Sequence, residues 1–287
     1  MRANTVIRYL ITLALLAAAV WIGKALWDRY MLSPWTRDGR VKADVVSVAA
    51  DVSGLVTEVA VKDNQAVRKG DVLFAIDPAR YRAALAQAEA ALAGHKADKT
   101  RRGKEAARRA SLDSAIVSTE SRESADFAAS AADAQYQAAL AARDLAALNL
   151  SRAVVRAPAD GYVTNLNVHV GDYAAAGAAR LALIDSHSFY VDGYFEETKL
   201  ANLKVGERAE VTLMSDGRKL GGRIASIARG ITDRDAATGR ELLADVNPTF
   251  NWVRLAQRVP VRIELDALPK DLALIAGQTC TVVIAGH

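Results

Sequence analysis

The chain has very few residues of the kinds that form disulfides or bind metals. Its 287 residues include a single cysteine, Cys280, so an internal disulfide is excluded. Cys280 lies in the apolar run TCTVVIAG, where we expect a small buried core residue. The four histidines are scattered along the chain without the spacing of metal ligands. We therefore predict no metal site.

Motifs of the common enzyme classes are also missing. The chain has no GxSxG, P-loop, HExxH or GxGxxG pattern. Asp185, Ser186 and His187 are the residue types of a catalytic triad, but adjacent residues cannot easily align a nucleophile, a base and an orienting group. We interpret these three as turn residues and predict that the protein is not an enzyme.

A strong excess of charge of one sign is lacking as well. The formal net charge is +4, and residues 1–30 hold four basic residues against one acidic residue. The remainder is nearly neutral, so no broad phosphate-binding face is expected. Residues 96–109 hold seven Lys or Arg against two acids, but no interleaved aromatic residue could stack on bases. We expect no nucleic-acid partner.

Proline is absent between Pro78 and Pro158, and only two glycines interrupt this stretch. Alanine dominates it, together with residues of high helix propensity. Ser118 is a good N-cap after a break at 112–118, so the pattern predicts two helices of about 34 residues, each about 50 Å long. Apolar positions recur on one face of each predicted helix: Tyr81, Leu85, Ala88 and Leu92 on the first, and Leu140, Leu145 and Leu148 on the second.

Residues 51–77 and 157–185 are two copies of one pattern, in which apolar and polar residues alternate. Alternation is typical of half-buried strands, and neither copy is long enough to bury a core by itself. Glycines recur at equivalent positions of the two copies: Gly54 and Gly161, and Gly70 and Gly177. The two copies are therefore expected to pack together.

Because both copies belong to one domain, the helices between them must leave that domain and return to it. We predict that residues 44–77 and 154–185 form one β-sandwich in two halves. Residues 78–153 then form an antiparallel coiled-coil hairpin.

The two predicted arms of the hairpin carry opposite charge near their turn. The basic stretch described above lies in the first arm, whereas residues 120–133 of the second hold four acids against one base. We propose that Arg101 and Lys104 pair with Glu123 and Asp126 and so set the register of the arms. The alternative is two solvated faces, because exposed ion pairs are worth under about 1 kcal/mol each.

Residues 9–23 are apolar except for Thr12, and with their flanks they approach the roughly 20 residues that span a bilayer. Arg2 and Arg8 precede this stretch, so the positive-inside rule keeps the N-terminus in the cytoplasm. We predict a cytoplasmic tip and a single transmembrane anchor in residues 1–30.

Two tryptophans, Trp21 and Trp27, lie where an interfacial aromatic belt of such an anchor would be. The alternative is a signal peptide cleaved near the alanines at 17–19. In both cases the rest of the chain lies across the membrane from the N-terminus.

Residues 186–287 return to strand-like patterns. Five alternating runs separated by turn residues suit a small antiparallel β-barrel, with an irregular insertion at 231–253. Residues 31–43 are polar with one proline, which predicts an extended lead-in. The predicted fold class is mostly β plus α: a transmembrane helix, a sandwich split by a helical hairpin, and a barrel.

A β domain in two halves resembles the biotinyl and lipoyl carrier domains, and we call it lipoyl-like. Carriers attach their cofactor to a lysine in the tight turn between the halves. Residues 78–156 occupy that place here, and the first half ends in FAIDP without a lysine. We therefore expect no cofactor.

Four stretches carry a more specific resemblance: SPWTRDGRVKADVVSVAADVSG (33–54), VRAPADGYVTNLNV (155–168), FYVDGYFEETKL (189–200) and NWVRLAQRVPVRI (251–263). With the order of the predicted segments, they resemble the HlyD-type membrane fusion proteins, and within that family the adaptor subunits of p-hydroxybenzoic acid efflux pumps. The resemblance covers essentially the whole chain.

The resemblance implies a periplasmic adaptor. Such adaptors are held in the inner membrane with their bulk in the periplasm, and they form rings, here expected to be hexameric. They join an inner-membrane exporter to a TolC-type outer-membrane channel. Their hairpin tips dock through an Arg-Leu-Ser pattern, matched here by Arg108, Leu112 and Ser118 with one residue fewer between Leu and Ser than in many relatives. The alternative is an ordinary helix end capped by Ser118.

The cargo that the resemblance implies is an aromatic carboxylic acid such as p-hydroxybenzoate. Two alternatives stay open. One is an adaptor for a different exporter, of the major facilitator, ABC or RND type. The other is a membrane-anchored coiled-coil scaffold with no transport role.

Overall fold

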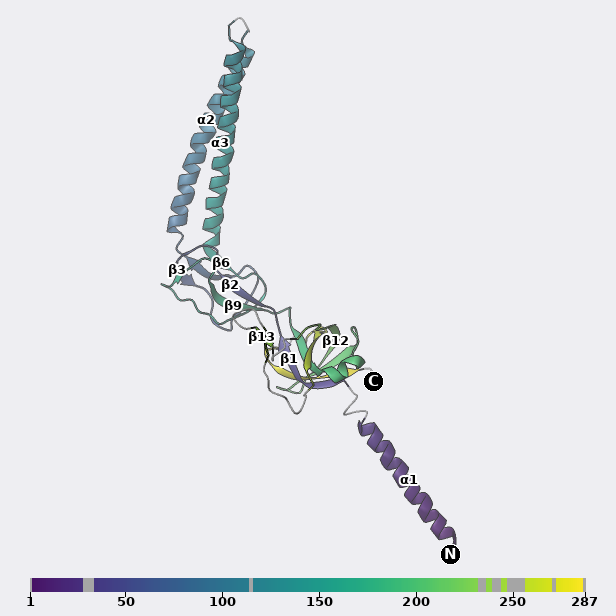
Figure 1. Ribbon diagram of the computed structural model, residues 1–287. Helices are drawn as coiled ribbons and strands as arrows, with labels where there is room; N and C mark the ends of the chain where they lie inside the picture. Colours follow the sequence, from purple (N-terminus) through teal and green to yellow (C-terminus); the bar gives the residue numbers. More distant parts are fainter. Residues whose placement is uncertain are drawn as a thin grey trace. The chain divides into compact units, whose positions relative to one another are not determined.

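The computed structural model of the protein (Figure 1) falls into two compact units, Met1–Asp44 with Ser188–His287, and Val45–His187. The residues that the structure describes are 2–27, 34–113, 116–231, 236–238, 244–246, 256–269 and 272–285.

The two copies of the repeat fold into one domain made of two four-stranded sheets. The first sheet has the order β2 (Val45–Ala49), β9 (Ala179–Asp185), β7 (Gly161–Thr164) and β4 (Ala66–Val67). The second has the order β6 (Val154–Arg156), β5 (Val72–Ile76), β3 (Gly54–Val59) and β8 (Tyr173–Ala174). The β-rich split domain predicted from the repeat is therefore present.

Each copy of the repeat gives its short middle strand to the sheet of the other copy. Gly54 pairs with Ala174 across β3 and β8, and Gly161 pairs with Val67 across β7 and β4. This exchange buries one shared core, whose fully buried side chains include Leu73, Phe74, Val163 and Leu183. Neither copy could bury these side chains alone.

The second pair of aligned glycines occupies equivalent turns. Gly70 and Gly177 both have positive φ, +93° and +78°, which favours glycine. The amide of Gly70 donates to the carbonyl of Ala157, and that of Gly177 to the carbonyl of Ala50, each over 2.9 Å. Each turn thus binds the chain where the other copy of the repeat begins.

Two long antiparallel helices follow β5 and lead back to β6 (Figure 1). They are α2 (Ala79–Ser111) and α3 (Thr119–Arg152). Ser118 is the N-cap of α3, and its hydroxyl accepts the amide of Ser121 at 3.2 Å. The predicted break and cap are confirmed.

Buried and half-buried side chains recur along both helices at intervals of alternately three and four residues, the heptad pattern of a coiled coil. We call these positions the seam. On α2 they are Tyr81, Leu85, Ala88, Leu92, His95, Lys99, Arg102, Ala106 and Arg109. On α3 they are Arg122, Ala125, Ala129, Ala132, Tyr136, Ala139, Arg143, Ala146 and Leu150.

The seam confirms the apolar face predicted for the first helix but not the one predicted for the second. Leu145 and Leu148 are 59% and 44% exposed. The seam passes instead through Arg143, Ala146 and Leu150. Alanine is so frequent along α3 that the leucines alone do not identify the buried face.

The other unit contains a closed, antiparallel, six-stranded barrel. Its strands, in spatial order, are β1 (Trp35–Lys42), β10 (Tyr190–Glu196), β15 (Arg258–Leu265), β12 (Lys219–Ile227), β11 (Arg208–Leu213) and β16 (Thr279–Ala285). A 3-10 helix, η2 (Glu197–Asn202), follows β10. Five of the six strands are the five runs predicted from the sequence.

The sixth strand, β1, corrects the predicted extended lead-in, because it closes the barrel between β10 and β16. Its buried residues are Thr36, Gly39 and Val41, a set without apolar alternation. Gly39 lies against Cys280, because a Cβ added there would be 2.7 Å from the Sγ atom. Cys280 is fully buried, as predicted, and burial raises its pKa to about 11.

The insertion expected at 231–253 contains one short antiparallel pair, β13 (Ala236–Thr238) with β14 (Ala244–Val246). The remainder of that expected insertion lies outside the described residues, apart from residue 231.

The N-terminal segment is a helix, α1 (Arg2–Trp27). Within the described ranges, no helix has both the length and the apolar character that a membrane crossing requires. Charged residues limit the apolar stretch of α1, because Arg8 and Lys24 leave 15 uncharged residues between them. Its described side chains, residues 10–24, are all exposed. The helix is thus present, while its transmembrane role stays a prediction.

Candidate docking site at the hairpin tip

The tip of the hairpin is formed where α2 ends and α3 begins. The last turn of α2 carries Arg108 and Arg109, and Leu112 follows in an extended conformation. The hydroxyl of Ser111 donates to the carbonyl of Arg108 at 2.8 Å and so satisfies one terminal carbonyl of the helix. Leu112 and Ile116 are both exposed, so the tip presents apolar side chains beside a basic helix end.

Two arginines join the helices just behind the tip. Arg122 of α3 donates through Nη2 to the carbonyl of Leu112 at 2.7 Å. Arg109 of α2 lies 3.3 Å from both the carbonyl and the hydroxyl of Ser121, and it also pairs with Glu105 at 2.6 Å. These contacts hold the ends of both helices at a fixed separation.

The structure places all three residues of the predicted docking pattern at this tip. Arg108 and Leu112 are exposed, four residues apart at the end of α2. Ser118 is exposed too, but its hydroxyl already serves as the N-cap of α3. Sequence reasoning missed Arg109, Arg122 and Ile116, because nothing in their local pattern distinguishes them from neighbouring residues.

The four residues predicted to pair across the arms are all exposed, and the arms are joined elsewhere. Arg101 bonds Asp98 of its own helix and lowers the pKa of that carboxyl. Lys99 crosses to Asp133, with 2.5 Å between Nζ and Oδ1. The Lys99 ammonium also lies 4.6 Å from the ring centre of Tyr136. Lys99 of the seam thus joins the two arms through Asp133, while the pairing of the four outer charges stays a prediction.

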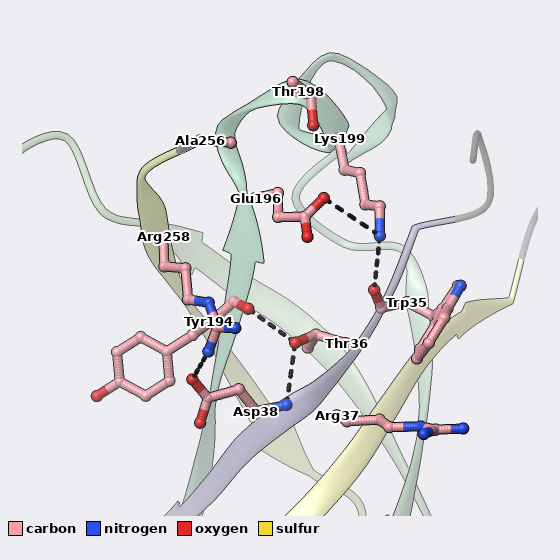
Figure 2. Close-up of a pocket in the computed structure, with 10 residues that line it drawn as sticks. All are labelled: Trp35, Thr36, Arg37, Asp38, Tyr194, Glu196, Thr198, Lys199, Ala256 and Arg258. Atoms are coloured by element: carbon pink, nitrogen blue, oxygen red, sulfur yellow. Dashed lines mark hydrogen bonds and ion pairs between the residues drawn. The ribbon is translucent and has the colours of Figure 1, made fainter. Parts of the chain in front are cut away.

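The barrel carries a cleft of about 920 Å³ between β1 and the end of β10, shown in Figure 2. Lys199 reaches Glu196 at 3.6 Å and lies 5.2 Å from the ring centre of Trp35. Arg258 pairs with Asp38. Both carboxylates therefore face a cation, and the cleft offers polar and aromatic surface.

Two other groups singled out in the sequence have structural roles. His187 donates its amide to the carboxylate of Asp185 at 2.8 Å, within an exposed turn that includes Ser186. Ser186 and His187 thus form the predicted turn, whereas Asp185 is the last residue of β9. At the end of the first half of the sandwich, the carboxylate of Asp77 accepts the amide of Ala79, the first residue of α2, at 2.9 Å.

A two-sheet sandwich interrupted by a coiled-coil hairpin, together with a six-stranded barrel, is the architecture of adaptor-type membrane fusion proteins. Residues 44–186 match the family model of the RND MFP barrel-sandwich hybrid domain, and residues 188–285 match that of the AAEA-like β-barrel domain. The uncharacterized protein YdhJ of Escherichia coli K12 is 44% identical over 97% of this chain and 98% of its own length. The chain belongs to the membrane fusion protein family.

Solved structures agree in fold. The membrane fusion protein Spr0693 of Streptococcus pneumoniae R6 has a TM-score of 0.62 at 19% identity, covering 87% of this chain and 98% of its own. A MacA–MexA chimera containing the Pseudomonas aeruginosa MexA α-hairpin has a TM-score of 0.60 at 23% identity, covering 88% and 82%. Family membership, rather than any missing motif, supports a non-enzymatic role.

Proposed function

We propose that this chain is the periplasmic adaptor subunit of a tripartite efflux pump, linking an inner-membrane exporter to a TolC-type outer-membrane channel. The observation that carries the proposal is the hairpin. Helices of 33 and 34 residues extend about 50 Å at 1.5 Å per residue. They bury little besides each other, which suits a spacer between two partners better than an enzyme.

Co-purification tests the adaptor role. The full chain, tagged at its C-terminus and extracted in mild detergent, should retain both an exporter and an outer-membrane channel. Retention of neither, from membranes where all three proteins are present, would favour the scaffold alternative. The Leu112→Asp variant, changed at the tip, should no longer co-purify with the channel but should still retain the exporter. Val205→Asp, at an exposed barrel position, is the matched control that should retain both.

The N-terminal helix is proposed to hold the chain at the inner membrane, with the bulk of the chain in the periplasm. Its exposed apolar side chains, Trp21 among them, support this. Lys24 can extend its charged end to the lipid headgroups and so compensate for a short apolar stretch. Trp27 lies on the same helix, at a position whose side chain the structure does not describe.

Fractionation tests this localisation. The intact chain should stay with inner membranes after alkaline carbonate washing, and added protease should digest it in spheroplasts but not in whole cells. A variant in which a cleavable secretion signal replaces residues 1–30 should be found in the periplasmic fraction. An intact chain that washes off the membrane would contradict the proposal.

Aromatic carboxylic acids such as p-hydroxybenzoate are the proposed cargo, on the basis of the four stretches of resemblance. A deletion strain should become more sensitive to hydroxybenzoates, and the wild-type gene should restore its tolerance. Unchanged sensitivity would remove this cargo but leave the adaptor role standing, with a different exporter as partner.

A further inference from the structure

The cleft of the barrel contains a lysine whose ammonium group is mostly buried but lacks close partners. Only 13% of the Lys199 side chain is exposed. Its Nζ atom lies 3.6 Å from the carboxylate of Glu196 and 3.5 Å from the carbonyl oxygen of Trp35. Both distances are long for hydrogen bonds of a charged donor, and a buried ammonium is costly unless its N–H groups are bonded. Lys199 can therefore donate to a further anionic oxygen.

A second cation lies beside the same aromatic ring. The guanidinium of Arg37 is 5.5 Å from the ring centre of Trp35, and the Lys199 ammonium is 5.2 Å from it. Arg37 is exposed, and among the residues that the structure describes no carboxylate forms an ion pair with it. Figure 2 shows Trp35 and Arg37 extending together to one side, while Lys199 reaches into the cleft. The cleft thus has one cation inside and one at its rim.

The side chains that line the cleft carry one positive charge in excess. The cations are Arg37, Lys199 and Arg258, and the carboxylates are Asp38 and Glu196. Asp38 pairs with Arg258, and Glu196 faces Lys199. The charge of Arg37 is left over, so a ligand with one net negative charge would neutralise the lining. The cleft volume of about 920 Å³ is large enough for a ligand much bigger than a simple inorganic anion.

The connection to the N-terminal helix keeps the cleft close to the end of that helix. α1 ends at Trp27 and β1 begins at Trp35, eight residues later. Eight residues span at most about 28 Å, even when they are fully extended. With α1 in the membrane, as proposed above, lipid headgroups are within reach of the cleft. A tryptophan beside basic side chains is also typical of residues that contact the membrane–water interface.

We propose that the cleft binds the headgroup of an anionic phospholipid, a phosphodiester with one net negative charge. Lys199 donates to the phosphate, and Arg37 and Trp35 form the rim that faces the bilayer. This inference rests on the membrane anchoring in the proposed function. It adds a second attachment, through which bound lipid orients the barrel on the membrane surface.

A phospholipid fits this cleft better than a small soluble anion does. An inorganic phosphate could bond Lys199, but it would leave the indole of Trp35 and most of the cleft volume without a contact. A lipid headgroup continues outward from its phosphate into the glycerol backbone, past the rim. Soluble phosphoesters share the phosphate chemistry, so the experiment has to separate the two sources.

Photolabelling of the full chain in vesicles tests the proposal. The protein is reconstituted into phosphatidylcholine that contains some phosphatidylglycerol with a photoreactive headgroup. After irradiation, the peptides that contain Trp35 and Thr198 should carry the label, because both residues line the cleft. Phosphatidylcholine with the same photoreactive group has no net charge, so it should label these peptides about fivefold less. Peptides of α1 are separated from those of the cleft, so lipid around the anchor does not affect the result.

Three variants assign the labelling to named side chains. Lys199→Gln should lower it about tenfold, because a charge-assisted hydrogen bond is lost, whereas Lys199→Arg should retain most of it. Arg37→Gln should lower it about fivefold, since one basic residue near a membrane surface is lost. Arg40→Gln is the matched control, because Arg40 is exposed on the same strand but does not line the cleft, and its labelling should equal that of the wild type. Arg37 is exposed, so its variant tests the cleft even if Lys199→Gln does not fold.

Three results would overturn the inference. Labelling that is unchanged in both Lys199→Gln and Arg37→Gln would refute the cleft as a lipid site. Equal labelling by the two photoreactive lipids would refute the preference for an anionic headgroup. Loss of labelling when glycerol phosphate is added in excess would assign the cleft to soluble phosphoesters instead.

Failure of this inference can be distinguished from failure of the proposed function. A chain that resists alkaline carbonate washing and co-purifies with its exporter and channel, but is not labelled in the cleft, would refute the lipid site and leave the adaptor role intact. A chain that washes off the membrane would refute the anchoring, and the lipid site with it.

Discussion

The two aligned glycines that begin β3 and β7 provide a sharp test of the sandwich, because they look equivalent in sequence but differ in surroundings. A Cβ added to Gly161 would lie 2.0 Å from the carbonyl oxygen of Ile184, which belongs to the backbone of the paired strand β9. A Cβ added to Gly54 would lie 2.5 Å from Cγ2 of Ile76, the end of a side chain. A side chain can move aside, whereas a paired strand cannot.

The expected magnitudes follow from this difference. Gly161→Ala should destabilise the sandwich by about 3 kcal/mol, because overpacking costs about 1–3 kcal/mol and the strands must also separate and weaken their hydrogen bonds. Gly54→Ala should cost about 1–2 kcal/mol, since Ile76 can change its rotamer. Gly94→Ala is the matched control. Gly94 lies within α2 with nothing within 4 Å of an added Cβ, so the change should stabilise α2 by about 0.5–1 kcal/mol.

Hydrogen exchange followed by mass spectrometry measures these effects segment by segment. Peptides covering β7 and β9 should lose the most protection in Gly161→Ala, whereas peptides of the barrel strand β15 should be unchanged and serve as an internal reference. Equal effects of Gly161→Ala and Gly54→Ala, or a larger effect of Gly54→Ala, would refute the reasoning. Loss of protection in Gly94→Ala would refute the assignment of that position as open space.

Three further predictions concern single groups. Asp133→Ala should lower the melting temperature of the hairpin, because it removes the ion pair with Lys99. The two side chains are 41% and 47% exposed, so the pair is worth about 0.5–1 kcal/mol, and the difference from the wild type should vanish in high salt. Cys280 should not react with DTNB at pH 8 in the folded protein, since burial raises its pKa to about 11. Because this pKa is raised, the contribution of Cys280 to the free energy of unfolding should be lost as the pH rises from 9 to 11, which denaturant titrations can check. Ser118→Ala should destabilise the hairpin by about 1 kcal/mol, whereas Ser118→Asp should have almost no effect, because aspartate also caps helices. If the Ser118→Asp variant keeps its stability but no longer binds the channel, Ser118 has a docking role beyond the cap.

The sequence predicted most of the β architecture, because its signals there are local. Glycine at both Gly70 and Gly177 corresponds to a backbone of positive φ in the structure, and alternation marks five of the six barrel strands. The sixth was missed for a physical reason. β1 turns Thr36 and Gly39 toward the interior, where the hydroxyl of Thr36 donates to the carbonyl of Tyr194 at 2.7 Å. A polar residue and a glycine do not produce an apolar pattern.

The hairpin shows a different limit of sequence reasoning. Its length, break and cap were predictable, because helix propensity and Ser118 signal them directly. The buried face of α2 was predictable, because Leu85 and Leu92 lie in the seam. The buried face of α3 was not, because Leu145 lies outside the seam. When alanine occupies inward and outward positions alike, hydrophobicity alone cannot assign the face. Only the heptad spacing that both helices share assigns it.

The composition of the seam also implies that the hairpin is not equally stable along its length. Near the sandwich it contains large apolar residues, such as Leu85, Leu92 and Leu150, whereas toward the tip Lys99 and Arg102 occupy the same kind of position. Long basic side chains cover neighbouring alanines with their stems and keep their charge near solvent, so they bury less apolar surface than leucine. Stability should therefore decrease from base to tip, and the arginine contacts behind Leu112 offset part of this decrease where a partner would dock.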